Sequence, residues 1–226
     1  MPRSRIALLT VAAIIGFAAL WSMRPPRPPG PKLPTTAPSN PTSNIPRPTS
    51  SLILPTDPIR GDRSAPLVIV EFSDFSCPAC AEIQETLSTL REEYGNRLAI
   101  VWKDLPHLDR ITGSQRLHIA ARCASILGSN DAFWTYHDAL FRTHAPDEET
   151  LLTIADALRL PRPAFQACQA AAGSASASAL IAANAAAADA LGITATPTLF
   201  VNGTRVPDPA TPAAIRTLLE RANAAN

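Results

Sequence analysis

Cysteine is scarce in this sequence, with four residues among 226. Small domains that depend on disulfides instead of a hydrophobic core are dense in cysteine, so this composition excludes a disulfide scaffold. Only one pair of cysteines is closely spaced, which argues against a zinc site built from two such pairs. The histidines are also few and lack the spacing of a metal site or a catalytic triad, so we expect them at the surface or in packing: His107, His118, His137 and His144.

Clusters of positive charge are missing from most of the chain. The formal net charge of +1 hides an asymmetry, because residues 1–63 carry +6 and residues 64–226 carry −5. Nucleic-acid binding needs clustered cations that face the phosphates. The acidic larger part of the chain therefore argues against nucleic acid as a partner.

The N-terminal region contains the one long apolar run. A short tail, residues 1–5, precedes 18 uncharged residues at positions 6–23. A membrane-spanning helix needs about 17–25 such residues. A signal peptide has a shorter apolar region and ends in a small-residue cleavage site, which is not evident here. We expect an uncleaved signal-anchor at residues 6–23, with a cleaved signal peptide as the alternative.

Residues 24–60 are rich in proline, with twelve prolines between Arg24 and Pro58. Such a segment buries too little apolar surface to fold by itself. In an extended polyproline conformation it reaches up to about 100 Å, at roughly 3.1 Å per residue. We expect a linker that holds a domain of residues 61–226 away from the membrane.

The chemistry of that domain centres on Cys77 and Cys80, a C-x-x-C sequence. An apolar run at residues 67–72 predicts a strand before it, and apolar residues at helical spacing follow it as far as Tyr94. Unpaired N–H groups at a helix N-terminus stabilise a thiolate, which is the reactive form of cysteine. We expect Cys77 to be partly exposed and to attack, and Cys80 to be buried and to resolve.

The remaining pattern predicts an α/β fold. A second strand is expected at residues 98–102, followed by several helices and an alanine-rich helix that ends at Gly192. Pro197 begins a short apolar strand, Asn202-Gly203 predicts a hairpin turn, and a last helix starts at Pro212. The order is βαβ, helices, then ββα.

Three stretches resemble the DsbA-like thiol-disulfide oxidoreductases of the thioredoxin superfamily: Val70 to Cys80, Phe133 to Phe141, and Thr196 to Gly203. The resemblance covers about Gly61 to Leu219. It implies a thioredoxin fold with a helical insert at about residues 111–172, and activity without a bound cofactor or a metal.

The resemblance also assigns roles near the C-x-x-C. It implies that Pro197 is a cis-proline facing the sulfurs and that the Thr196 backbone pairs with an extended substrate segment. Pro78 and Ala79 between the cysteines tune the pair. Some strongly oxidising relatives have a histidine at the position of Ala79, so we expect a less extreme reduction potential here.

Glu71 interrupts the apolar strand that leads to the cysteines. A buried carboxylate must be paired, hydrated or protonated. In the family, a glutamate at this place lies beneath the dithiol and relays protons to the buried cysteine. Two alternatives remain open: Glu71 faces solvent near the strand end, or it pairs with Lys103.

Cys123 and Cys168 have two interpretations that the sequence leaves open. Buried free cysteines behave as small hydrophobic residues, so both can be core thiols. An oxidising compartment favours a structural disulfide between the two insert helices instead.

We therefore expect a membrane-anchored enzyme with its catalytic domain on the extracytoplasmic, periplasmic side. It exchanges disulfides with protein substrates, as an oxidase that a quinone-linked membrane oxidase regenerates. The alternatives are a tethered reductase or isomerase recycled by a membrane reductase, a dedicated electron donor to one client, and a non-enzymatic binding module.

Overall fold

The computed structural model describes residues 51–107, 113–143, 145–170 and 174–225. The predicted tail, the anchor at residues 6–23 and the linker as far as residue 50 lie outside this part. Within the described ranges, no helix is both long and apolar enough to cross a membrane.

The described strands form a five-stranded mixed sheet with the order β1-β3-β2-β4-β5. The strands are β1 (Ile59–Arg60), β2 (Leu67–Ser73), β3 (Leu98–Asp104), β4 (Thr198–Val201) and β5 (Thr204–Arg205). Strand β2 runs parallel to β3, and the other neighbours are antiparallel. The predicted hairpin joins β4 to β5, with positive φ at Asn202 and Gly203.

Helices cover both faces of this sheet, so every residue of β2 is buried. Side chains alternate between the faces along a strand. Leu67 and Ile69 pack in the same core as residues of α3 (Pro78–Tyr94) and α9 (Pro212–Ala224). Val68 and Val70 belong to a second core that includes Ala188 of α8 (Ala175–Ala190). The short 3-10 helix η1 (Gly95–Arg97) links α3 to β3.

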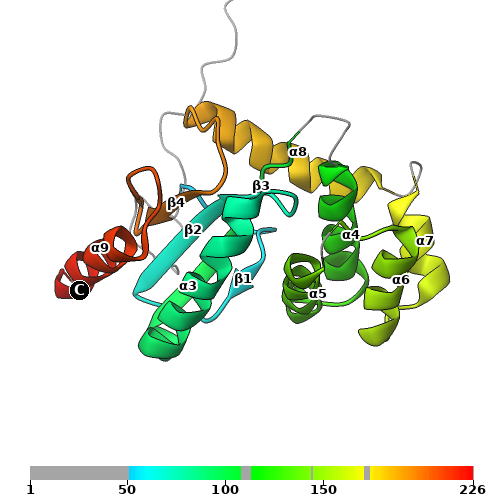
Figure 1. Ribbon diagram of the computed structural model, residues 1–226, viewed down its shortest axis with the longest axis horizontal. Coiled ribbons are helices and arrows are strands. Elements are labelled where there is room, and N and C mark those ends of the chain that lie inside the picture. Colours follow the sequence, from blue (N-terminus) through cyan, green and yellow to red (C-terminus); the bar gives the residue numbers. More distant parts are fainter. Residues whose placement is uncertain (1–50, 108–112, 144, 171–173, 226) are drawn as a thin grey trace, which may run out of the picture. The chain divides into compact units, whose positions relative to one another are not determined.

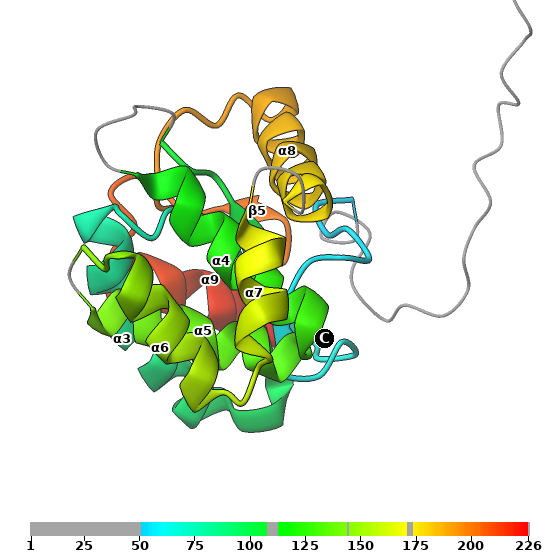
Figure 2. The same ribbon diagram turned by 90° about the vertical axis from the view of Figure 1, so that its right-hand side faces the viewer.

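The helical insert lies to one side of the sheet (Figure 1). It consists of α4 (Ser114–Leu127), α5 (Asn130–Arg142), α6 (Glu148–Ala157) and α7 (Arg162–Gln169). Figure 2 shows these four helices grouped together, with α8 above them. Helix α4 packs against α5, α7 and α8, so α8 connects the insert to the sheet.

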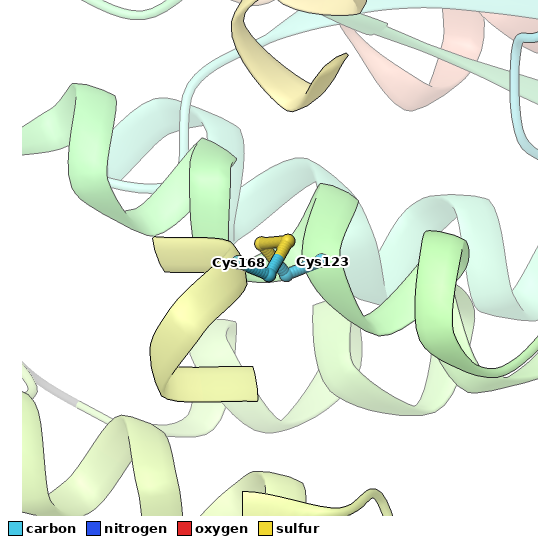
Figure 3. The surroundings of a disulfide bond; sticks show 2 residues. All are labelled: Cys123 and Cys168. Atoms are coloured by element: carbon cyan, nitrogen blue, oxygen red, sulfur yellow. A yellow bond between two sulfur atoms is a disulfide. The ribbon is translucent and has the colours of Figure 1, made fainter. Parts of the chain in front are cut away.

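A disulfide between Cys123 of α4 and Cys168 of α7 joins two insert helices (Figure 3). The bond decides between the two interpretations that the sequence left open. Cys123 is fully buried within the main hydrophobic core, and Cys168 packs against that core.

The linker was predicted to end at residue 60, but the folded domain begins before residue 61, so this boundary was wrong. Leu52, Asp57 and Ile59 are buried. The main chain of Ile59 bonds in both directions with the Asn130 side-chain amide, at 2.9 and 2.8 Å. Ile59 also pairs with Val101 in the sheet. The proline content of this stretch hid a short apolar segment that the insert and the sheet cover.

Candidate redox site

The C-x-x-C lies where β2 hands over to α3, as the sequence predicted. Cys77 is the N-cap residue of α3, with Pro78 in the first turn. Both cysteines are free thiols, Cys77 half-buried and Cys80 buried. A partly exposed sulfur at a helix N-terminus and a buried one a turn later suit the attacking and resolving roles.

The turn before Cys77 is held by Asp74. The Cys77 N–H donates to the Asp74 carbonyl at 3.1 Å. The Asp74 carboxylate accepts from the N–H and the hydroxyl of Ser76, at 2.8 and 2.9 Å. It also accepts from the Ser114 hydroxyl at the start of α4, at 2.6 Å. The insert is thus bonded directly to the turn that presents the sulfur.

The loop before β4 lies against the same sulfur. The Thr196–Pro197 peptide bond is cis. The Thr196 carbonyl is 3.5 Å from Sγ of Cys77 and accepts a hydrogen bond from the thiol. Residues 119 positions apart in the chain are therefore brought together at the site, as the resemblance implied.

Two clefts flank the exposed segment formed by Pro78 and Ala79. The first, of about 560 Å³, lies between the C-x-x-C and the insert, and its lining includes Phe75, Cys77, Pro78, Leu117, Leu140 and Phe141. The second, of about 540 Å³, lies on the opposite side, and its lining includes Ala79, Ile83, Thr196, Pro197 and Pro209. The first cleft thus reaches Cys77 itself, and the second borders Ala79 and the cis-proline loop.

Glu71 is fully buried on the α3 side of the sheet, so the alternative that it faces solvent was wrong. Its Oε1 accepts from the Gln84 side-chain amide at 2.9 Å, and its Oε2 has no partner among the described residues. Burial raises the pKa of Glu71 to about 7. The same Gln84 amide donates to the Cys80 carbonyl at 3.1 Å.

Cys80 responds to the same environment. Burial, and then the negative charge of Glu71, raise the pKa of the Cys80 thiol well above its ordinary value. A buried thiolate at Cys80 is therefore strongly disfavoured, and a negative charge on Glu71 adds to this effect.

The suggested pairing of Lys103 with Glu71 was wrong. Lys103 is buried and binds Asp57, with Nζ 2.7 Å from Oδ2. Strands β2 and β3 are parallel, with Glu71 opposite Trp102 and Phe72 opposite Lys103. Neighbours in register share a face, so Glu71 and Lys103 point to opposite sides of the sheet.

Two histidines pack around Phe75, which lies two residues before Cys77. The expectation of a packing role is confirmed for both, but their place beside the redox site was not predicted. His118 and His137 are buried, and their rings lie 4.8 and 5.5 Å from the Phe75 ring. His118 also contacts Asp104, with Nδ1 2.7 Å from Oδ1. The available signal was the i,i+4 spacing of His118 and Arg122, which both face Asp104.

The other two histidines differ from this pair. His107 is exposed, and His144 lies outside the described residues. Among the residues that the structure describes, no group of three or more histidine, cysteine or acidic side chains is arranged to hold a metal ion.

Fold and site together define a thioredoxin-fold protein with a helical insert and a dithiol in which Cys77 is partly accessible and Cys80 is buried. The chain belongs to the thioredoxin family, because residues 54–221 match that family's model. Among solved structures, it is similar to a thioredoxin-like oxidoreductase from Silicibacter pomeroyi, at 27% identity and a TM-score of 0.65, covering 77% of this chain and 96% of that one.

More distant structures share the same fold. The thiol-disulfide exchange protein alpha-DsbA2 from Wolbachia pipientis has 17% identity and a TM-score of 0.67, over 81% of this chain and 94% of that one. Oxidised BdbD from Bacillus subtilis has 20% identity and a TM-score of 0.63, over 74% and 92%. With the family match, these structures confirm that the chain has the fold expected from its resemblance to the DsbA-like proteins.

Curated relatives are longer proteins. The chain is 34% identical over 159 residues to the Na(+)/H(+) antiporter NhaA 1 of Salinispora arenicola, which is 68% of this chain and 23% of the antiporter. It is 31% identical over 216 residues to the NhaA 1 antiporter of Mycolicibacterium gilvum, which is 90% of this chain and 31% of that protein. The chain thus spans about a quarter to a third of the length of these relatives.

Proposed function

We propose that this protein is an extracytoplasmic thiol:disulfide oxidoreductase that oxidises the thiols of protein clients through the Cys77–Cys80 pair. The observation that carries the proposal is the placement of Cys77. Its sulfur is half-exposed at the N-terminus of α3, contacts the Thr196 carbonyl, and precedes the buried Cys80 by one turn.

In the oxidase direction, the Cys77–Cys80 disulfide is the oxidant. A client thiolate attacks Sγ of Cys77, the bond between the two sulfurs breaks, and Cys80 leaves as a thiolate that takes up a proton. A second client thiolate then attacks the client sulfur of the mixed disulfide and displaces Cys77. Two electrons pass from the client to the pair, the client gains a disulfide, and Cys77 and Cys80 are left reduced.

Glu71 is the proton donor and acceptor for Cys80 in this scheme. Its pKa of about 7 means that both protonation states are populated near neutral pH. A protonated Glu71 gives its proton to the departing Cys80 thiolate. When the pair is reoxidised, an ionised Glu71 accepts the proton of the Cys80 thiol. The Gln84 amide donates to the Glu71 carboxyl and to the main-chain carbonyl of Cys80, and so holds the carboxyl near the start of α3.

Client chains bind in extended form across the exposed Pro78–Ala79 segment. The clefts on its two sides offer apolar surface to side chains that flank the client cysteine. The main chain of Thr196 is the pairing partner for the client backbone. This mode depends on an unfolded segment, so the clients are newly exported chains that have not yet folded.

We place the domain on the extracytoplasmic side, anchored through residues 6–23. The Cys123–Cys168 disulfide supports an oxidising compartment. The antiporter names of the curated relatives support a membrane setting. A quinone-linked membrane oxidase would return the reduced pair to the disulfide.

Trapping of mixed disulfides tests this proposal. In the full chain, Cys80→Ala leaves Cys77 able to attack a client disulfide but removes the resolving sulfur. We expect a covalent, reductant-sensitive adduct with a peptide that contains one disulfide. Cys77→Ser is the matched control and should give no adduct and no oxidation of a reduced two-cysteine client. An adduct through Cys80, or client oxidation by Cys77→Ser, would overturn the assignment.

A further inference from the structure

His118 lies between two carboxylates beneath the redox site. Its ring is fully buried on α4. Nδ1 is 2.7 Å from Oδ1 of Asp104, and Nε2 is 3.5 Å from Oδ1 of Asp74. Burial lowers the pKa of His118, but the contacts with Asp104 and Asp74 outweigh this effect and leave it above the ordinary value. The two flanking carboxylates therefore favour the protonated form of His118.

Asp74 transmits this contact to the nucleophile. Its carboxylate binds the N–H and hydroxyl of Ser76, and its carbonyl accepts the N–H of Cys77. The other carboxylate oxygen of Asp74 accepts a hydrogen bond from the main-chain N–H of His107 at 2.7 Å. Phe75 follows Asp74 in the chain, and its ring packs directly on the ring of His118. Two neighbouring residues of the Cys77 turn thus touch the same buried histidine.

The charges around His118 come from three elements. Asp74 follows β2, Asp104 ends β3, and Arg122 lies one turn further along α4, with Nε 2.6 Å from Oδ2 of Asp104. His137 of α5 faces the same cluster, but burial lowers its pKa to about 4, so it is neutral near pH 7. Asp104 also binds the Arg122 guanidinium, whereas the ring of His118 lies between Asp104 and Asp74.

We propose that His118 is a positioning residue of the redox site, which offsets the charge of Asp74 so that this carboxylate can hold the Cys77 turn without opposing a thiolate at Cys77. The inference deepens the proposed function and rests on Cys77 as its nucleophile. A carboxylate three residues before a thiolate is a like charge, which disfavours the thiolate unless a cation is paired with it.

The test uses the full chain and the equilibrium of the Cys77–Cys80 pair with glutathione at pH 7. In His118→Gln, the Asp74 charge is uncompensated, so the reduced form is disfavoured. We expect an equilibrium shift of about tenfold toward the disulfide, which corresponds to about 30 mV. Asp74→Asn keeps an oxygen for Ser76 but removes the negative charge, so it should shift the equilibrium the opposite way.

The double variant separates charge from packing. With both substitutions, neither charge remains, and the equilibrium should return to within about twofold of the parent value. A merely structural role predicts that the double variant departs at least as far as His118→Gln. His107→Gln is the matched control, because its side chain is exposed, and should leave the equilibrium unchanged.

Three results would overturn the inference: no shift in His118→Gln, a shift toward the disulfide in Asp74→Asn, or a double variant that departs further than the single one. If His118→Gln does not fold, the sign of the shift in Asp74→Asn alone decides. This measurement uses glutathione and no protein client. A failure of client oxidation would therefore contradict the proposed function without changing the interpretation of the His118→Gln result.

Discussion

The buried carboxyl of Glu71 makes the protein's stability depend on pH in an unusual direction. Its pKa is about 7 in the folded protein and 4.5 as the ordinary value. An acid whose pKa is raised by folding is protonated in the native state and ionised in the unfolded state between those two pH values. Below about pH 4.5, Glu71 is therefore neutral in both states and does not lower the free energy of unfolding. As the pH rises from 4.5 toward 7, the free energy of unfolding falls.

The magnitude follows from the same two values. Each tenfold change in an acid dissociation constant corresponds to about 1.4 kcal/mol, so ionisation of Glu71 costs the folded protein about 3 kcal/mol. Glu71→Gln keeps the shape and removes the charge. We expect it to be more stable than the parent by about 3 kcal/mol at pH 8 and by close to nothing at pH 4, where both side chains are neutral.

Urea unfolding at pH 4, 6 and 8 measures this difference, on the full chain with the Cys77–Cys80 pair reduced. The matched control is Glu85→Gln on the exposed side of α3, which should track the parent at every pH. A parent and a Glu71→Gln variant whose unfolding free energies stay parallel from pH 4 to 8 would refute the reasoning. The same variant should resolve mixed disulfides more slowly, because Cys80 loses its proton partner.

Two further predictions concern stability. Lys103→Met should lower the free energy of unfolding by about 3–5 kcal/mol in urea titrations, because it leaves the buried Asp57 without its ion-pair partner. Arg205→Met removes an exposed ion pair and should cost under about 1 kcal/mol. An unchanged urea midpoint for Lys103→Met would contradict the buried pair. Replacing Cys123 and Cys168 by serine removes a disulfide that links residues 45 positions apart. The free energy of unfolding, measured by calorimetry, should fall by about 4 kcal/mol, and client oxidation should persist. Loss of oxidation in a folded variant would make this disulfide part of the reaction.

The redox centre could be predicted because its signals are local or highly specific. A C-x-x-C between a strand and a helix fixes the exposure of each sulfur through helix geometry alone. The Asn202-Gly203 turn likewise requires positive φ at consecutive residues, which short-range sequence encodes. Contact between Thr196 and Cys77 came only from the family resemblance, since no local pattern connects residues so far apart.

The buried ion pairs could not be predicted, because each depends on how distant segments meet. Lys103 and Asp57 are 46 residues apart, and Asp57 lies in a stretch whose composition indicated a linker. The strand register decides that Lys103 faces α8 and Glu71 faces α3, and a shift of one residue would exchange those faces. The contacts of His118 could not be predicted either, since its partner Asp74 lies in the turn after β2 and its partner Asp104 ends β3.

The reduction potential of the Cys77–Cys80 pair tests the central claim most directly. The full chain would be equilibrated in glutathione buffers, and the pair quantified by alkylation and mass spectrometry so that Cys123 and Cys168 remain bonded. The oxidase direction predicts a value near or above about −180 mV, in the range of known disulfide donors and isomerases. A value near about −270 mV, like that of thioredoxin, would make this protein a reductant and contradict the account.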